Sequence, residues 1–276
     1  MEDFLIKARE LLSYTTELMT FALLIGRTMP MIVLTPFLAG KIAPTELKMG
    51  LGISLSLLIW PVATAGMTGQ LVYAPGPFLL LMLKETFIGF AIGFVNAHIF
   101  YAMEMSGRII DTVRGVSMSE VQVPHSQQRA TLTGSLYYQL LLIVFFAAGG
   151  HHVFFNAYFD SYLTIPINEG IATGLGLTAL TDFIAKLTGD ILTIAVRLAA
   201  PIIAATLITD IVFGILNRVA PQLNAYFMSM PVKALGGVIV IFIAFSAVLA
   251  SFNEFTIWGS EAMRDIIAYF SKTIGM

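Results

Sequence analysis

The chain alternates long apolar segments with short polar ones. Each apolar segment is long enough to cross a bilayer as a helix, which takes about twenty residues. The apolar segments cover approximately residues 12–38, 45–66, 77–113, 130–159, 187–216 and 234–253. The pattern therefore predicts an all-α polytopic membrane protein with about six long apolar helices, which we treat as a single helical membrane domain over residues 1–276.

Prolines and glycines within these segments predict that several helices are kinked or broken. Pro30 and Pro36 interrupt the first segment and Pro201 the fifth, and proline removes a helical hydrogen bond. The pair Gly149 and Gly150 is placed to end or bend the fourth segment.

The remaining stretches are expected to be shorter elements. Residues 1–11 form an amphipathic lead, and 160–183 a loop followed by a short amphipathic helix. Residues 217–233 are predicted to form a polar hairpin. The tail over 255–276 repeats apolar residues at helical spacing, which indicates an amphipathic interfacial or docking helix that need not span the membrane.

The third segment is longer than a bilayer requires and becomes polar toward its end. As a helix it extends roughly 55 Å, so either it bends or its second half leaves the lipid. Glu104, Arg108 and Asp111 share one face, and the Glu104–Arg108 order favours an ion pair. This charged face indicates either a salt-bridged helix end at the membrane surface or a helix that lines a polar conduit. Gly89 and Gly93 allow close approach of another helix.

Four ionisable residues lie inside apolar segments and are expected to be buried. Such groups face protein or water, because exposure to hydrocarbon is costly. They are Arg27, Asp190, Arg197 and Asp210. They either pair with neighbouring helices, as expected for Arg27 with a carboxylate, or form the ion or substrate site of a secondary transporter.

Composition narrows the possible functions. The sequence is 57% hydrophobic and 12% charged, and its net charge of −2 argues against a nucleic-acid partner. The absence of cysteine excludes disulfides, thiolate catalysis and cysteine-ligated metals. His151 and His152 are adjacent and point about 100° apart on a helix, so they are poorly placed to share a metal ion.

Known catalytic motifs are also absent. The sequence has no phosphate-binding P-loop, no H-E-x-x-H and no G-x-S-x-G. We therefore expect neither an enzyme nor a protein that binds a cofactor or a metal.

Several blocks of sequence together resemble one family. GRTMPMIVLTPFLAGKIAPTELKMGLGISLSLLIWP, KETFIGFAIGF, SGRIIDTVRG, DSYLTIPI and APQLNAYFMSMPVKALGG resemble, in order, the FliR/SctT family of type III secretion and flagellar export. The third block carries the pattern Gly-x-x-Ile-Asp-x-x-x-Gly at Gly107, Ile110, Asp111 and Gly115.

The resemblance implies a structural and gating subunit of a protein-export channel in the bacterial inner membrane. Such a subunit completes a helical assembly with FliP/SctR-type and FliQ/SctS-type proteins, next to an FlhB/SctU-type protein, around a path for unfolded exported proteins.

The resemblance also implies functional residues. A plug-like loop would cover about 115–129, with candidates at Gly115, Val116, Ser117, Met118 and Ser119. Candidates for contacts with other subunits are Pro221, Gln222, Leu223, Asn224, Pro231 and Lys233. The alternative to this function is the secondary transporter.

Overall fold

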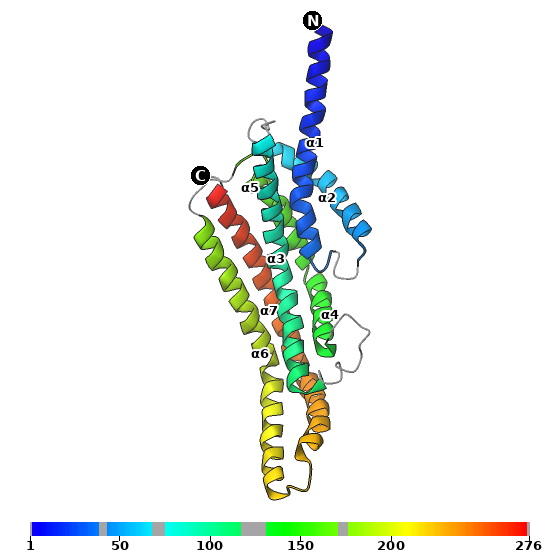
Figure 1. Cartoon of the computed structure of the whole chain (residues 1–276), viewed down its shortest axis with the longest axis vertical. Helices are drawn as coiled ribbons and strands as arrows, with labels where there is room; N and C mark the ends of the chain where they lie inside the picture. Colours follow the sequence, from blue (N-terminus) through cyan, green and yellow to red (C-terminus); the bar gives the residue numbers. More distant parts are fainter. Residues whose placement is uncertain (1, 39–42, 68–74, 117–130, 171–175, 275–276) are drawn as a thin grey trace. The chain divides into compact units, whose positions relative to one another are not determined.

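The structure, a computed structural model, describes residues 2–38, 43–67, 75–116, 131–170 and 176–274. These residues form helices and no strands (Figure 1). The helices are α1 (Glu2–Leu34), α2 (Thr45–Ala65), α3 (Pro75–Val113), α4 (Leu132–Ala147), α5 (Gly150–Thr164), α6 (Gly176–Val219) and α7 (Ala225–Ile274).

The expected set of long apolar helices is confirmed. Five helices in the described part are long and apolar enough to cross a membrane, and α4 with α5 makes six if the bent pair is one span. The pair bends by 72°. At the bend, Gly149 follows the C-cap Ala148 and has φ +75°, a left-handed conformation that glycine adopts without steric cost.

Helix boundaries differ from the sequence-based expectation in three places. The described part of the lead, from Glu2, belongs to α1, which continues through Pro30 and ends at Leu34. The separate amphipathic helix before residue 187 is absorbed into α6, which begins at Gly176. The hairpin over 217–233 reduces to a turn at 220–224, and α7 runs without interruption into the tail. Polar residues mark where a helix leaves an apolar environment, but they are compatible with helical backbone and do not end it.

The chain divides into two compact units. The first comprises Met1–Ala97, Gly150–Ile184 and Trp258–Met276, and the second comprises His98–Gly149 and Ala185–Ile257. The prediction of a single domain stays a prediction.

In the first unit, α2 contacts both α1 and α5, and α1 packs closely on the first half of α3. Gly89 permits this packing, because a Cβ atom there would overlap the carbonyl oxygen of Arg27. A Cβ at Gly93 would lie 2.9 Å from the carbonyl oxygen of Met31. The G-x-x-x-G pattern therefore places the backbones of α1 and α3 against each other.

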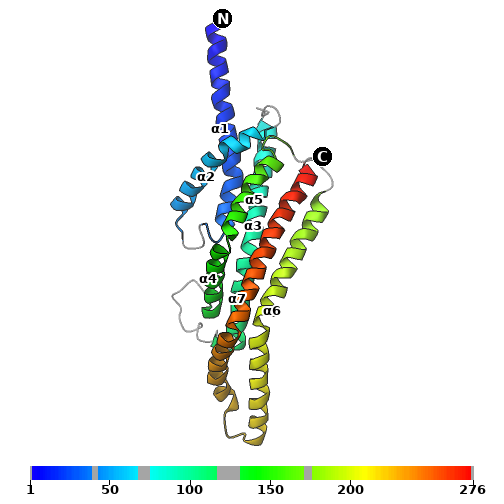
Figure 2. The ribbon, with the colours of Figure 1, turned by 180° about the vertical axis from the view of Figure 1, so that it is seen from behind.

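The second unit contains the C-terminal half of α3, α4 and the hairpin of α6 and α7, which lie side by side (Figures 1 and 2). A Cβ atom at Gly107 would overlap the Cα atom of Gly134, so α3 and α4 touch through their backbones. Aromatic rings fill the interior: Phe100 packs on Phe145 with centroids 5.6 Å apart.

Candidate functional site

The first unit holds a buried group of ionised side chains, which we call the charge cluster: Arg27, Lys84 and Glu85. Arg27 donates from Nε to Glu85 Oε2 at 2.5 Å and from Nη2 to Oε1 at 3.0 Å. Lys84 Nζ lies 2.9 Å from Glu85 Oε1. All three residues are at most 1% exposed. The pairing is bidentate, which is the strong geometry for an arginine and a carboxylate.

The charge cluster has two cations and one carboxylate, and backbone carbonyl oxygens accept hydrogen bonds from both cations. Arg27 donates to the carbonyl oxygens of Ser161 and Ile165 at 2.8 and 2.9 Å. Lys84 donates to those of Pro166 and Glu169 at 2.7 and 2.8 Å. The last carbonyls of a helix lack helical donors and carry partial negative charge. The charge cluster therefore caps the C-terminal end of α5 and holds the segment that follows it.

Hydroxyl groups extend this polar interior across α1, α2 and α5. Thr28 Oγ1 lies 2.6 Å from the Tyr158 hydroxyl and accepts a hydrogen bond from Ser56 Oγ at 3.2 Å. The Arg27 guanidinium lies 4.2 Å from the centre of the Tyr162 ring. Hydrogen bonds between helices contribute to their association in a membrane, where lipid is as apolar as the side chains and the hydrophobic effect does not drive packing.

Sequence reasoning identified Arg27 but missed its partners. The signal was available: Lys84 and Glu85 are adjacent charges inside a segment that is otherwise nearly all apolar over residues 78–93. What could not be read was that backbone carbonyls at the end of α5 and in the segment after it would accept hydrogen bonds from both cations.

The second unit holds a different polar site, which we call the loop base: Asp111, Arg114, Gly115 and Thr133. Asp111 Oδ2 accepts from the backbone N–H of Thr133 at 2.9 Å, and Oδ1 accepts from the Thr133 hydroxyl at 2.5 Å. Thr133 is the second residue of α4, so its N–H has no helical partner. The N-cap residue Thr131 makes no side-chain cap bond, and Asp111 from α3 supplies the cap instead.

Arg114 joins a third helix to the loop base. Its Nη2 donates to the carbonyl oxygen of Ala234 in α7 at 2.6 Å. Its Nη1 lies 3.5 Å from Thr133 Oγ1 and 3.7 Å from Asp111 Oδ1. The next residue, Gly115, has φ +78° and follows the end of α3.

The loop base bounds the segment expected to be a plug. Of the expected plug segment over 115–129, the structure describes Gly115 and Val116, and the next described residue is Thr131. Ser117, Met118 and Ser119, named as plug candidates, lie outside the described residues. The hydrogen bonds between Asp111 and Thr133 therefore tie the helix before this segment to the helix after it.

The charged face of α3 has two environments. Arg108 donates to Glu104 at 2.8 Å and is 53% exposed at its side chain. Asp111 is 1% exposed. The face therefore carries a surface ion pair and, one turn further, a buried cap.

The four charges expected to be buried are not alike. Arg27 is fully buried, Asp190 is half-buried, and Arg197 and Asp210 are exposed in this chain, so the expectation of burial is wrong for the last two in the chain alone. Asp210 instead pairs with Lys233 and so connects α6 with α7.

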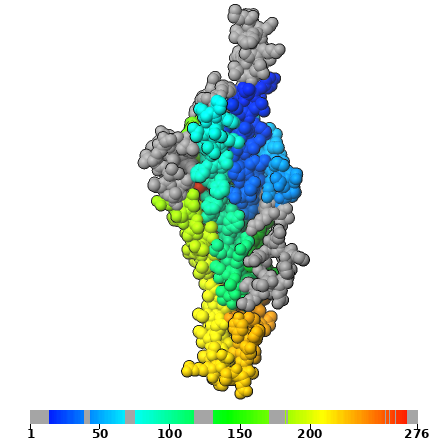
Figure 3. Space-filling model, viewed as in Figure 1, coloured from blue at the N-terminus to red at the C-terminus, as the bar shows by residue number. Residues whose placement is uncertain are grey.

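The candidates for subunit contacts lie on the α6–α7 hairpin. Pro221, Gln222, Leu223 and Asn224 form its exposed turn, whereas Pro231 and Lys233 lie inside α7. Figure 3 shows the surface of this hairpin in yellow and orange.

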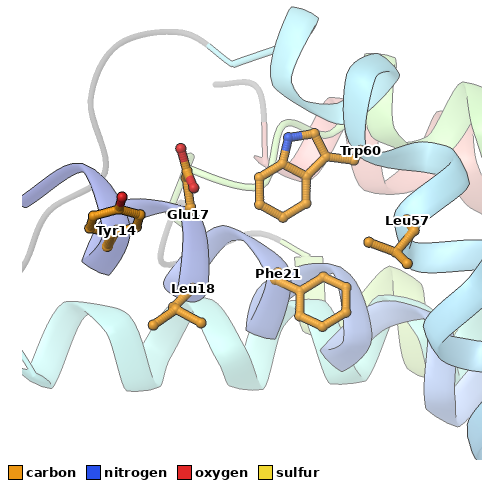
Figure 4. Close-up of a pocket in the computed structure, with 6 residues that line it drawn as sticks. All are labelled: Tyr14, Glu17, Leu18, Phe21, Leu57 and Trp60. Atoms are coloured by element: carbon orange, nitrogen blue, oxygen red, sulfur yellow. The ribbon is translucent and has the colours of Figure 1, made fainter. Parts of the chain in front are cut away.

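The described residues offer no catalytic arrangement that we recognise. They contain no group of three His, Cys, Asp or Glu side chains able to hold a metal ion. A groove of about 310 Å³ lies between α1 and α2 (Figure 4). Its lining is mainly aromatic and aliphatic, with Glu17 as the one ionisable acid: Tyr14, Glu17, Leu18, Phe21, Leu57 and Trp60.

Comparison with known proteins decides the family. Residues 18–257 match the family described as bacterial export proteins, family 1. This chain belongs to that family. The match covers both the charge cluster and the loop base, and it confirms the resemblance to the FliR/SctT proteins of the type III export apparatus.

Individual relatives agree with this assignment. Yop proteins translocation protein T of Yersinia pestis is 30% identical over 220 residues, which are 79% of this chain and 82% of that protein. Secretion system apparatus protein SsaT of Salmonella typhimurium is 29% identical over 234 residues, 83% of this chain and 87% of the relative. Flagellar biosynthetic protein FliR of Escherichia coli is 27% identical over 228 residues, 83% and 84% of the two chains.

The family and the helices together give a coarse functional statement. Relatives include both secretion-system and flagellar proteins, and the described part contains several apolar helices. This export protein is a multi-pass membrane protein with a role in the type III protein-export apparatus.

Proposed function

We propose that this chain is a structural and gating subunit of the type III export gate in the bacterial inner membrane. It completes a helical channel for unfolded proteins together with FliP/SctR-type and FliQ/SctS-type subunits, next to an FlhB/SctU-type protein. The observation that carries the proposal is the loop base, which ties α3 to α4 on either side of the segment that resembles a plug.

The length and polarity of α3 support this role. The helix has 39 residues, which extend roughly 58 Å and exceed a bilayer core of about 30 Å. The segment after it is polar, with Ser117, Ser119, Ser126, Gln127 and Gln128. A polar segment fastened at both ends can close a wet path by steric filling and weak hydrogen bonds, and can still yield to a passing chain.

The surface of the second unit supports a partner role. Large apolar side chains are exposed along α6 and α7, including Val219 at 78% and Phe242 at 81%. Lipid or neighbouring subunits must cover such residues. The contact candidates in the turn and at Pro231 and Lys233 lie on the same hairpin.

The contacts of the described residues do not favour the transporter alternative. Arg27, which is fully buried, is engaged by Glu85 and by two backbone carbonyls, an arrangement that suits a structural cap. Among the other candidate charges, Arg197 and Asp210 are exposed.

Deletion of Gly115–Ser119 tests the gating role. We expect normal amounts of assembled complex and a closed membrane that leaks small ions, measured as conductance of inner-membrane vesicles. A deletion of residues 171–175, which has the same length and lies between α5 and α6, is the control. Unchanged conductance in the Gly115–Ser119 deletion, at normal complex levels, would disprove gating by this segment.

Native mass spectrometry of the tagged chain tests the structural role. Extraction from its own membrane in mild detergent should give one copy with several copies of two small hydrophobic proteins. A monomer or homodimer that recurs across detergents would instead favour the transporter.

A further inference from the structure

Arg114, the residue directly after α3, fastens the end of that helix to α7 with a buried side chain. We propose that Arg114 is a positioning residue of the export gate: it clamps the end of α3 to α7 in a space that Gly237 keeps open, so that the α6–α7 hairpin sets where the loop base lies. This inference rests on the proposed function, but the clamp itself consists of described residues only.

The contact is specific in its geometry. Arg114 is 5% exposed, and its Nη2 donates to the Ala234 carbonyl oxygen at 2.6 Å. That oxygen lies inside α7, and a carbonyl has a second lone pair available beyond its helical bond. A hydrogen bond with a charged donor is about twice as strong as a neutral one. The guanidinium therefore binds α7 without breaking the helix.

Gly237 provides the room for this side chain. A Cβ atom at Gly237 would overlap Cδ and Nε of Arg114, whereas a Cβ atom at Gly236 would meet no atom within 4 Å. Glycine weakens a helix relative to alanine, because it loses more backbone freedom on folding. Of the two adjacent glycines, only Gly237 has a packing reason to be there, and that reason is Arg114.

The clamp connects two parts of the second unit. On one side, Arg114 immediately precedes Gly115 and lies against Asp111 and Thr133 of the loop base. On the other, Lys233 pairs with Asp210 of α6, one residue before Ala234. A shift of the hairpin against its neighbours is thus transmitted to the loop base through Arg114.

A purely structural role of Arg114 would give a different experimental result from a positioning role. If Arg114 only neutralised a buried carboxylate, its loss would lower the amount of folded complex. If it positions the gate, its displacement leaves assembly in place and changes the tightness of the closed channel.

The two adjacent glycines provide a matched test. Gly237→Ala displaces the Arg114 side chain while every charge stays in the chain, and Gly236→Ala adds the same methyl group to the same turn of α7 without a clash. Both variants are compared in membranes that carry the complete export apparatus. We expect Gly237→Ala to raise the resting ion leak about tenfold at normal complex levels, because losing a charge-assisted hydrogen bond shifts a two-state ratio by about that factor. Gly236→Ala should match the wild type.

A second variant and a distance measurement keep the inference testable if Gly237→Ala misfolds. Arg114→Met retains the aliphatic stem but cannot bind Ala234, and it should leak to a similar degree. The chain has no cysteine, so spin labels at Thr112→Cys and Leu235→Cys, both exposed, report the separation of α3 and α7 in the purified complex. Either clamp variant should broaden this distance distribution.

The outcomes separate this inference from the proposed function. A broadened distance with a normal leak, in a protein whose Gly115–Ser119 deletion does leak, would overturn the positioning role and leave the gate intact. An unchanged distance in both clamp variants would overturn the clamp. A deletion that does not leak would overturn the gate and the inference together.

Discussion

The charge cluster of the first unit and the loop base of the second both place ionised side chains at the end of a helix. In the first unit cations bind carbonyl oxygens, and in the second a carboxylate binds an N–H group. In the charge cluster, Arg27 donates to the carbonyl oxygens of Ser161 in the last turn of α5 and of Ile165 just after it, and Lys84 donates to that of Pro166. In the loop base, a carboxylate caps an N–H at the start of α4, and one cation reaches the backbone of α7. Both place the charge that the helix end favours.

The difference lies in what each site fastens. The charge cluster joins α1 and α3 to the end of α5 and to the residues that follow it, so its bonds stabilise the fold of the first unit. The loop base joins α3, α4 and α7 where the segment over 115–129 begins. The three buried ionised groups of the charge cluster suit a contact that stays fixed. The few hydrogen bonds of the loop base suit a contact that passes a shift of the α6–α7 hairpin to the end of α3.

The largest expected effect comes from Glu85→Ala. It leaves Arg27 and Lys84 buried without a counter-charge, and breaking a buried pair in this way costs about 3–5 kcal/mol. Arg27→Ala should cost less, because Glu85 keeps Lys84 at 2.9 Å, and it should lower the amount of assembled complex rather than its specificity. Thermal melting in detergent and complex yield measure both. Normal assembly of Arg27→Ala with altered ion dependence of export would revive the transporter.

Next in size is the close contact of α1 and α3. Gly89→Ala places a methyl group on the Arg27 carbonyl oxygen, and such overpacking costs about 1–3 kcal/mol. Gly50→Ala in α2 is the control, because a Cβ atom there meets nothing within 4 Å. Gly107→Ala is the counterpart in the second unit. Equal melting temperatures for Gly89→Ala and Gly50→Ala would rule out the contact.

A smaller decrease in the free energy of unfolding is expected for a substitution at the loop base. Asp111→Asn removes the charge and one acceptor oxygen, so it should cost about 1–2 kcal/mol, as for a lost cap. Hydrogen exchange at the first amides of α4 measures the effect locally. Thr112→Ala, a neighbouring exposed position, is the control. If exchange in α4 is the same in both variants, Asp111 is not the cap.

The smallest effect belongs to the surface pair on α3. Glu104→Gln should cost less than about 1 kcal/mol, because Arg108 is 53% exposed and water screens the pair. High salt should remove the difference from wild type in a melting experiment. A loss as large as that of Asp111→Asn would mean that a partner buries this part of α3 in the assembly.

Much of the fold follows from local pattern. The spans of α2 and α3 and the bend at Gly149 were predicted closely, since apolar length and a glycine pair are local features. The extents of α6 and α7 differ from the pattern-based prediction, because the polar residues Asn217 and Arg218 lie within α6 and do not end it. Whether such residues continue a helix depends on surroundings that a linear pattern does not contain.

The sequence by itself determined that this is an apolar helical membrane chain, and its ordered motifs indicated the FliR/SctT family. These properties depend on composition and on spacing along the chain. Only the tertiary structure decided that Lys84 and Glu85 complete the site of Arg27, that Asp111 caps α4, and that Gly237 exists for Arg114. Each of these contacts joins residues far apart in sequence, and each depends on the distance between two backbones.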